Sequence, residues 1–375
     1  MTSATAVKPA RTRLDSLTGL RFFAAFGVVM FHTLSNGNGT GHWRVPGTGL
    51  IATAGFVGVT FFFVLSGFVL TWSWEPGLAK RYFYGRRFAR IYPLYLVAWI
   101  AALLLLRNNG HVPNGSEMAA SLLLIQSWLM SPHFVYAVSP VFWTLSCELF
   151  FYAMLPFVAP RLVRFKERSL LLVAGGCVAW LVVGAFLAAV GMKQGTAAKI
   201  SVFPPYRFGE FLLGVVAALL VKRGWRSPGG RPVALVLVVV TYLAGGELVT
   251  KLAHHHETNW TQFAANLLLV VPITMLIASY AVGDAEGERS WASVRPLVKL
   301  GEWSFALYLF HRTIVGMLQN QFAGGVHGTL GTTARWGFVV LVCIAVSAVA
   351  HEAIERPVEK WLRRRIGHPT ETHPT

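Results

Sequence analysis

The first long apolar segment, residues 17–35, carries an arginine and a histidine, Arg21 and His32. Charged and titratable groups are costly inside a membrane and rarely face lipid, so both are candidates for a functional site. A helix turns roughly 100° and rises about 1.5 Å per residue, so eleven positions bring both side chains to one face, about 16 Å apart. The spacing predicts a helix that turns both toward the interior of a bundle, near opposite membrane surfaces.

Glu148, in the apolar segment 141–158, is the acidic partner that we expect for His32. If the segments 17–35 and 141–158 cross a membrane in opposite directions, His32, Glu148 and Trp143 all fall in the outer half of that membrane. A carboxylate beside an imidazole fixes the tautomer and stabilises the protonated form, which suits a general base that takes a proton from a hydroxyl group. The alternative for a buried histidine is a structural hydrogen bond. The Arg21–His32 face favours catalysis, with Trp143 contacting the acceptor.

A basic and aromatic run, KRYFYGRRFARIYPLY, follows the second apolar segment at residues 80–95. Arg86, Arg87 and Arg90 would share one turn of helix at the mouth of the bundle. A guanidinium group can donate two parallel hydrogen bonds to the oxygens of one phosphate, and it stacks on aromatic or purine rings. We therefore expect a nucleotide-phosphate ligand here. The alternative is that the run only orients the chain and attracts anionic lipid.

Further polar residues interrupt other apolar segments. Ser304, Tyr308 and His311 recur at i, i+4 and i+7, which predicts a polar stripe on one helix. Arg207 and Glu210 lie one helical turn apart, either as an internal ion pair or as part of an outer site. We expect these five residues to contact the acceptor substrate.

Small residues mark the second apolar segment, where Gly58, Ser66 and Gly67 lie. They permit close helix packing, or alternatively form a narrow slot for an extended ligand chain, and Ser66 would then contact the donor. The histidine run at residues 254–256 has no second cluster of ligands, so we expect no metal site.

The composition excludes a soluble globular protein. Of 375 residues, 54% are hydrophobic and 13% charged, whereas soluble domains have about 45–50% apolar and roughly 25% charged residues. No nucleic-acid module accompanies the net charge of +17. We predict an all-α polytopic membrane protein, and an uncleaved first span because no cleavage site of small residues precedes it.

The elements that must position these residues are about ten transmembrane helices in one bundle. The expected spans are residues 17–35, 52–74, 91–107, 141–158, 169–190, 205–221, 232–248, 260–282, 297–320 and 332–354. Residues 117–130 give an eleventh candidate, which is shorter than the roughly 17–25 residues that a spanning helix needs.

Charge bias decides against the eleventh span. Loops rich in Lys and Arg stay on the cytoplasmic side. If residues 117–130 do not cross, 24 of the 33 basic residues gather on one side. We therefore predict that both termini are cytoplasmic and that residues 117–140 form a partly buried outer or re-entrant segment.

Several blocks of the chain together resemble the acyltransferase 3 family of integral membrane acyltransferases. Besides Arg21 and His32, the blocks in chain order are FFFVLSGFVL, RRFARIYPLY, WTLSCELFFY, RFGEFLLG, WSFALYLFHR and HEAIERPVEKW. Their order and spacing are specific, and they extend through nearly the whole chain.

The resemblance implies a ten-helix domain that uses cytoplasmic acyl-CoA, with acetyl-CoA the expected donor, to O-acylate a sugar or other hydroxyl acceptor. It implies that His32 is catalytic, that Arg21 is essential, that the RR-x-x-R motif bears on the donor, and that Glu148 belongs to the same set. No SGNH-type esterase domain follows residue 361, so we expect this protein to complete the transfer itself. Relatives of that kind modify lipid-linked sugars, exopolysaccharides or secondary metabolites such as macrolides.

The combined hypothesis is an O-acyltransferase of the plasma membrane that needs no bound cofactor. The CoA phosphates would dock on Arg86, Arg87 and Arg90, and His32, oriented by Glu148, would deprotonate the acceptor hydroxyl; an acyl-histidine intermediate is the rival chemistry. We expect tails at residues 1–16 and 361–375 around a domain at 17–360. The alternative function is a transporter or flippase, since such proteins also place Arg, His and Glu inside membranes.

Overall fold

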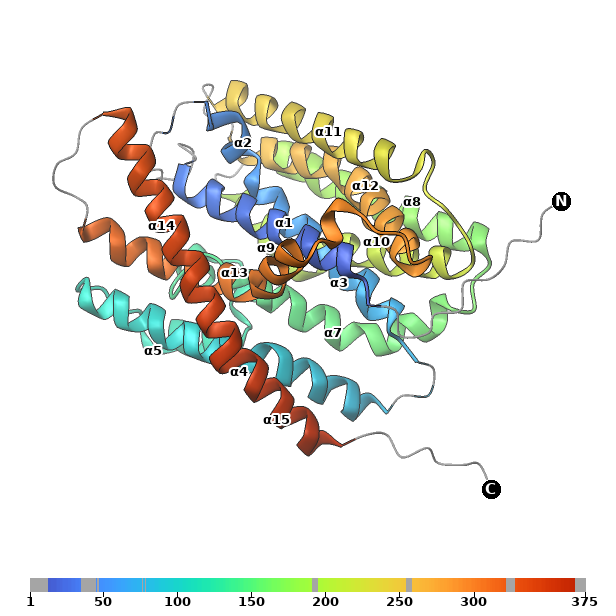
Figure 1. Cartoon of the computed structure of the whole chain (residues 1–375), viewed down its shortest axis with the longest axis horizontal. Coiled ribbons are helices and arrows are strands. Elements are labelled where there is room, and N and C mark those ends of the chain that lie inside the picture. The colour runs from blue at the N-terminus through green and yellow to red at the C-terminus, as the bar shows by residue number, and fades with distance from the viewer. Residues whose placement is uncertain are drawn as a thin grey trace.

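The protein is described by a computed structural model that covers residues 13–34, 45, 47–75, 77, 79–190, 195–253, 258–321 and 328–367. Within these ranges the chain forms helices and no strands, as predicted (Figure 1). The histidine run at 254–256 and the outermost parts of both expected tails lie outside the described residues.

Fifteen α-helices follow one another along the described chain. They are α1 Asp15–Leu34, α2 Gly49–Thr53, α3 Gly58–Trp72, α4 Lys80–Asn108, α5 Gly115–Leu122, α6 Pro132–Val135, α7 Trp143–Leu162, α8 Glu167–Val190, α9 Thr196–Val202, α10 Pro204–Lys222, α11 Gly230–Ala253, α12 Thr258–Ala285, α13 Arg295–Gln321, α14 Thr329–Ala350 and α15 Arg356–Ile366. Short 3₁₀ turns lie at Gly55–Val57, Gln126–Leu129 and Trp291–Ser293, and a π-turn at His351–Glu355 joins α14 to α15.

Nine helical segments of the described chain are long and apolar enough to cross a membrane. They match nine of the ten predicted spans. The tenth, at 297–320, coincides with α13, which has 27 residues but is less apolar because Glu302, His311 and Arg312 interrupt it. Helix α13 packs along α1, where a Cβ on Gly301 would lie only 1.7 Å from the Thr18 carbonyl oxygen.

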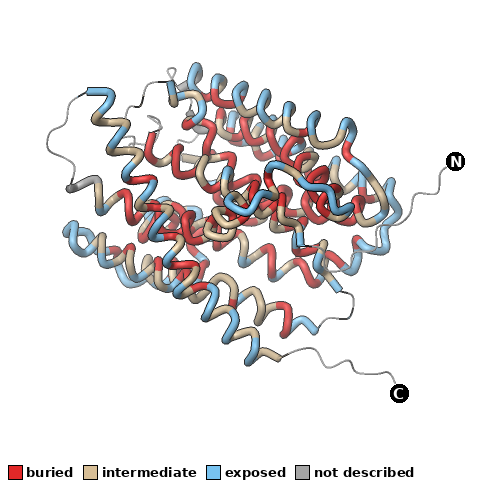
Figure 2. The backbone as a smooth tube through the Cα atoms, in the orientation of Figure 1, coloured by how far each residue is buried: buried red, intermediate tan, exposed pale blue. Residues whose placement is uncertain are grey.

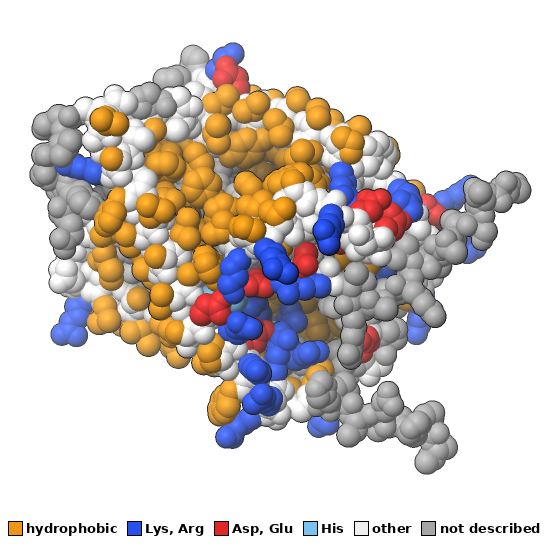
Figure 3. Space-filling model, viewed as in Figure 1, with side chains coloured by type: hydrophobic (Ala, Val, Ile, Leu, Met, Phe, Trp, Pro, Cys, Tyr) orange, Lys and Arg blue, Asp and Glu red, His pale blue; other side chains and the backbone are white. Residues whose placement is uncertain are grey.

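Burial separates inner from outer helices. Figure 2 shows buried residues concentrated on the central helices and exposed ones on α11, α14 and α15. The exposed residues of the outer helices are largely apolar, among them Leu172 on α8, Val236 on α11 and Leu341 on α14, and apolar side chains cover much of the face in Figure 3. An apolar outer surface around a packed interior is the arrangement that lipid requires.

The central contact between α3 and α10 depends on two glycines. A Cβ on Gly67 would lie 2.0 Å from the Phe211 carbonyl oxygen, and one on Gly214 would lie 1.9 Å from that of Val64. On the other side of α3, a Cβ on Gly58 would lie 2.3 Å from the Ala24 carbonyl oxygen of α1. The close approach expected for Gly58 and Gly67 is therefore present.

The described chain begins and ends at one end of the bundle, which we call the basic end. The Ser16 amide at the start of α1 donates to Asp284 at the end of α12 (2.9 Å), and Ile366 at the end of α15 packs on Gly85 near the start of α4. Lys and Arg side chains gather around α15 in Figure 3. The predicted cytoplasmic orientation would place this end inside the cell.

Residues 115–142 turn back into the bundle, as the re-entrant alternative predicted. The Tyr95 hydroxyl donates to the Ser121 carbonyl at the end of α5 (2.6 Å), and that of Tyr92 donates to Leu122 (3.2 Å). Tyr95 is 15 residues into α4, so this contact lies roughly 22 Å from the basic end. The Phe142 ring packs on Tyr95 with centroids 5.1 Å apart. Helix α7 therefore starts inside the bundle rather than at its surface.

Replacing Gly67 with Ala should destabilise the protein, because the methyl group cannot fit between α3 and α10. Overpacking of this kind costs about 1–3 kcal/mol. Gly176→Ala on α8 is the matched control, since nothing lies within 4 Å of its Cβ position and alanine favours helix. Thermal unfolding in detergent should show a lower Tm for Gly67→Ala alone; equal values would contradict the packing account.

A candidate active site inside the bundle

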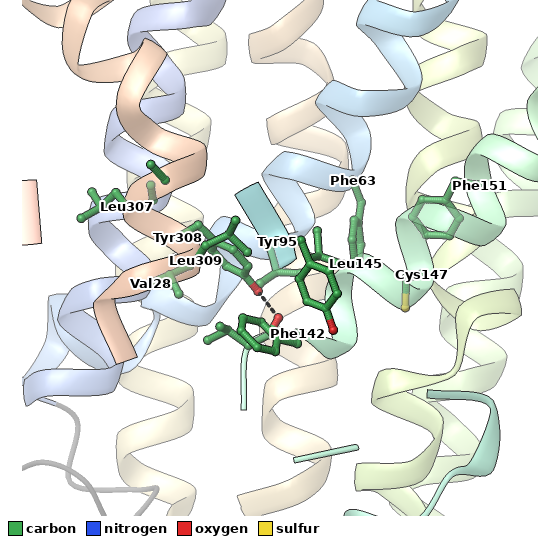
Figure 4. Packing of buried hydrophobic residues seen from close by; sticks show 14 of the residues in the cluster. Val28, Phe63, Tyr95, Phe142, Leu145, Cys147, Phe151, Leu307, Tyr308 and Leu309 are labelled. Atoms are coloured by element: carbon green, nitrogen blue, oxygen red, sulfur yellow. Dashed lines mark hydrogen bonds between the residues drawn. The ribbon is translucent and has the colours of Figure 1, made fainter. Parts of the chain in front are cut away.

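A cavity of about 220 Å³ lies between α1, α3, α4, α7 and α13. Figure 4 shows the packed centre of the bundle, where Phe63, Leu145 and Tyr308, which line this cavity, approach one another from α3, α7 and α13. Its polar lining consists of Arg21, Ser66, Arg87, Arg90, Thr144, Glu148, Tyr152 and Tyr308. We call it the central cavity.

Helix α3 supplies the apolar wall of the central cavity. The lining residues Val59, Phe62, Phe63, Ser66, Val69 and Leu70 recur at helical spacing and so form one stripe. The Ser66 hydroxyl donates to that of Tyr152 (3.4 Å). One stripe of α3 thus offers a long, mostly apolar surface, while its glycines hold it against α1 and α10.

Two of the three cavity arginines have no direct hydrogen-bonding or ion-pair partner among the described residues. Neither Arg21 nor Arg87 has a hydrogen bond or an ion pair within the part of the chain that the structure describes, and the Arg87 Nε is buried without a partner. Glu148 is the one carboxylate in the lining, and its Oε2 accepts from Tyr152 (3.1 Å). A concave site with an excess of guanidinium groups suits an anionic ligand.

Arg90 is held differently, by two carboxylates from the end of the chain. It forms ion pairs with Glu355, whose side chain is 1% exposed, and with Glu359 (3.0 Å). Glu355 also accepts from the Nδ1 atom of His351 (2.9 Å) across the π-turn. Sequence reasoning missed these partners, although the block HEAIERPVEKW placed a histidine and two glutamates at helical spacing beside the bundle.

His32 pairs with His311 and not with Glu148, so the predicted His32–Glu148 contact is wrong. The His32 Nδ1 lies 3.2 Å from His311 Nε2, and eleven residues of α1, about 16 Å, separate His32 from Arg21. Helix α7 starts inside the bundle at Trp143. Glu148 is five residues further along this helix, so Glu148 lies about 8 Å nearer to the basic end than Trp143 does. It therefore shares a cavity with Arg21 instead of meeting His32.

The hydrogen bonds fix the tautomers of both histidines. A carbonyl oxygen can only accept, so His311 Nδ1 donates to Tyr308 (2.8 Å) and His32 Nδ1 donates to Val28 (3.0 Å). When both rings are neutral, His311 Nε2 carries no proton, and the single His32 Nδ1 proton is shared between the Val28 carbonyl and His311 Nε2. A neutral His32 ring with its proton on Nδ1 carries none on Nε2, which is the state that a general base or a nucleophile requires.

Tyr308 connects the central cavity to the histidine pair. Its ring lines the cavity and lies 6.0 Å from the His311 ring. Its hydroxyl donates to the Val141 carbonyl (3.0 Å) and lies 2.9 Å from that of Thr144. Tyr308 and His311 thus lie together as the polar stripe predicted, and Tyr308 lies at the end of the cavity nearest to His32.

The other predicted acceptor contacts lie elsewhere. Arg207 and Glu210 form a buried ion pair (2.7 Å), one of the two alternatives for these residues, and the Arg207 guanidinium stacks on Trp143 at 5.5 Å. The Ser304 hydroxyl donates to the Gly301 carbonyl of its own helix (2.7 Å). None of the four is among the residues lining the central cavity.

The predicted cluster of three arginines is divided between two cavities. Arg87 and Arg90 line the central cavity, as does the predicted donor residue Ser66. Arg86 points away from them and lines a second cavity beside α15. Adjacent residues on a helix point about 100° apart, so Arg86 and Arg87 cannot share one surface.

These features define an integral membrane protein with a charged site enclosed by its helices. The family model of the acyltransferase domain, Acyl_transf_3, matches residues 14–352. The chain therefore belongs to this family and is an acyltransferase.

Named relatives agree with this assignment. The chain is 34% identical over 388 residues to acyltransferase MdmB of Streptomyces mycarofaciens, with 98% of this chain and 96% of that protein covered. It is 21% identical over 365 residues to O-acetyltransferase OatA of Staphylococcus aureus, with 92% and 57% covered. No solved structure matches the chain.

Replacing His311 with Leu should lower kcat for acyl transfer roughly ten- to a hundredfold, because His32 loses one of the two acceptors that orient its ring. His311→Gln is the matched variant, since its amide oxygen can still accept from His32 Nδ1. We expect Gln to retain more activity than Leu, with similar KM values. Equal kcat for the two variants would contradict a positioning role for His311.

Proposed function

We propose that this protein is an O-acyltransferase that moves an acyl group, acetyl in the simplest case, from acyl-CoA to a hydroxyl group of a sugar-containing acceptor. The observation that carries the proposal is the central cavity, which combines unpaired guanidinium groups with a long apolar wall and ends one helical turn from the His32–His311 pair. The relative OatA is an O-acetyltransferase by name, which supports oxygen as the acceptor atom.

The donor would enter from the basic end. Arg87 and Arg21 present unpaired positive charge inside the cavity, which complements the polyanionic donor, and Glu148 balances part of that charge when no donor is bound. The pantetheine arm of acyl-CoA is long and mostly apolar, and it would lie along the α3 stripe from Val69 to Phe62. Because Glu355 and Glu359 already neutralise Arg90, we assign it a structural part in this site.

The thioester would then lie beside Tyr308. In the structure the Tyr308 hydroxyl is held by Val141. A rotation of this side chain would open the cavity toward His32, which lies one turn beyond. We propose this movement as the step that brings donor and base together.

The chemistry requires one proton transfer and one exchange of bonds. His32 Nε2 takes the proton of the acceptor hydroxyl as its oxygen attacks the thioester carbonyl carbon. The new C–O bond forms, the C–S bond breaks, and the coenzyme A thiolate leaves. The thiolate recovers the proton from His32, which restores the neutral histidine pair.

The acceptor and the cellular setting are part of the same proposal. A glycolipid, an exopolysaccharide or a secondary metabolite such as a macrolide offers a sugar hydroxyl that could approach His32 from the end opposite the basic one. The apolar outer surface and the charge bias support a plasma-membrane protein whose basic end faces the cytoplasm. The donor and the acceptor would then reach the site from opposite sides.

The direct test is release of coenzyme A from acetyl-CoA by purified protein in proteoliposomes, with and without sugar acceptors. The wild type should release coenzyme A faster with a suitable acceptor. His32→Ala should lower this rate by about 10³-fold or more, because the base is lost, while Arg81→Ala, an exposed arginine outside both cavities, should not. Normal turnover by His32→Ala would contradict the mechanism.

A further inference from the structure

A second cavity, of about 480 Å³, lies at the basic end between α4 and α15. Its volume falls in the roughly 300–1,000 Å³ that is typical of small-molecule sites. The lining consists of Tyr82, Arg86, Arg356, Glu359, Lys360, Arg363, Arg364 and Gly367. Five cationic side chains thus face a single carboxylate. This surface is where Lys and Arg side chains gather in Figure 3.

Several of these cations have no acidic partner. Arg356 pairs with Glu352 (3.1 Å) and Arg363 pairs with Glu359. Arg86, Lys360 and Arg364 form no ion pair within the described part of the chain, and Arg86 stacks over the Tyr82 ring at 5.0 Å. Like charges held together in a concave surface favour a ligand with several phosphate groups.

The second cavity and the central cavity share one wall. Glu359 accepts from Arg90 of the central cavity and pairs with Arg363 of the second. Arg86 and Arg87 are neighbours on α4, and each lines a different one of the two cavities. A single extended ligand could therefore reach from the second cavity into the central one, with phosphate groups near arginines of both and a thioester in the central cavity.

We propose that the second cavity binds the 3′-phosphorylated nucleotide end of acyl-CoA. The inference rests on the proposed function and deepens it, because it gives the donor a second set of contacts on α15. These residues lie beyond the family match, which ends at residue 352. The 3′-phosphate lies against Arg86, Lys360 and Arg364. The 5′-diphosphate passes the Arg90–Glu359 pair and reaches Arg87, and the pantetheine arm continues into the central cavity.

The test measures binding of coenzyme A, 3′-dephospho-coenzyme A and pantetheine to the purified full-length protein in nanodiscs. The double variant Lys360→Ala/Arg364→Ala should weaken coenzyme A binding roughly tenfold or more, since two charge-assisted contacts are lost. Binding of pantetheine, which carries no phosphate, should change far less. Both side chains are exposed, so the fold should tolerate their removal.

Arg365→Ala is the matched control, because this arginine lies on the same helix but stacks on Trp361 outside the cavity lining. It should bind coenzyme A as the wild type does. Unchanged coenzyme A affinity in the double variant overturns the inference. So does an effect that appears only in nanodiscs of anionic lipid, which would assign the cavity to lipid headgroups. In both cases turnover of acetyl-CoA by the wild type would leave the proposed function standing, whereas a lack of turnover would refute that function itself.

Discussion

Arg21, Arg87 and Arg90 bring three guanidinium groups into one cavity within a bundle whose outer surface is apolar. A charge removed from water is stabilised only if other charges and hydrogen bonds replace the solvent, and an uncompensated one can cost several kcal/mol. Glu355 and Glu359 pair with Arg90, and Glu148 is the one carboxylate that lines the cavity together with Arg21 and Arg87. The cavity lining thus holds three guanidinium groups and one carboxylate, and Arg21 and Arg87 have no direct partner within the described part of the chain. The proposed affinity for acyl-CoA, a polyanionic donor, rests on these two unpaired groups.

The re-entrant segment sets the depth at which the remaining groups meet. Because residues 115–142 return to the middle of the bundle, α7 begins beside Tyr95, and Glu148 lies level with the arginines. The Val141 carbonyl is placed where it can hold the Tyr308 hydroxyl. Tyr308 thus lies between the charged central cavity and the histidine pair. In the proposed mechanism, donor binding and proton transfer would take place at different depths.

Local patterns in the sequence predicted much of this arrangement. Helical spacing alone placed Arg21 and His32 on one face, the apolar segments matched the observed helices, and charge bias excluded a span at 117–130. The family assignment was confirmed over most of the chain. The polar stripe also carried the signal for His311, although its partner was not recognised.

Contacts between distant segments could not be predicted in the same way. Pairing His32 with Glu148 assumed that the segment at 141–158 starts at the membrane surface, and no local pattern shows that the preceding residues turn back so far. Arg90 and Glu355 are 265 positions apart, and each resembles an ordinary charged residue near a helix end. The predicted cluster combined Arg86 with Arg87 because they are adjacent in a basic run. Helix geometry instead directs the two side chains into different cavities.

The account depends most on the central cavity being the chamber for the acyl donor. A cryo-EM structure with a non-hydrolysable thioether analogue of acetyl-CoA tests it directly. We expect the pantetheine arm along α3, the acyl carbonyl next to His32 Nε2, and the Tyr308 side chain rotated away from Val141. An analogue bound elsewhere, with Tyr308 unmoved and the cavity empty, would contradict it.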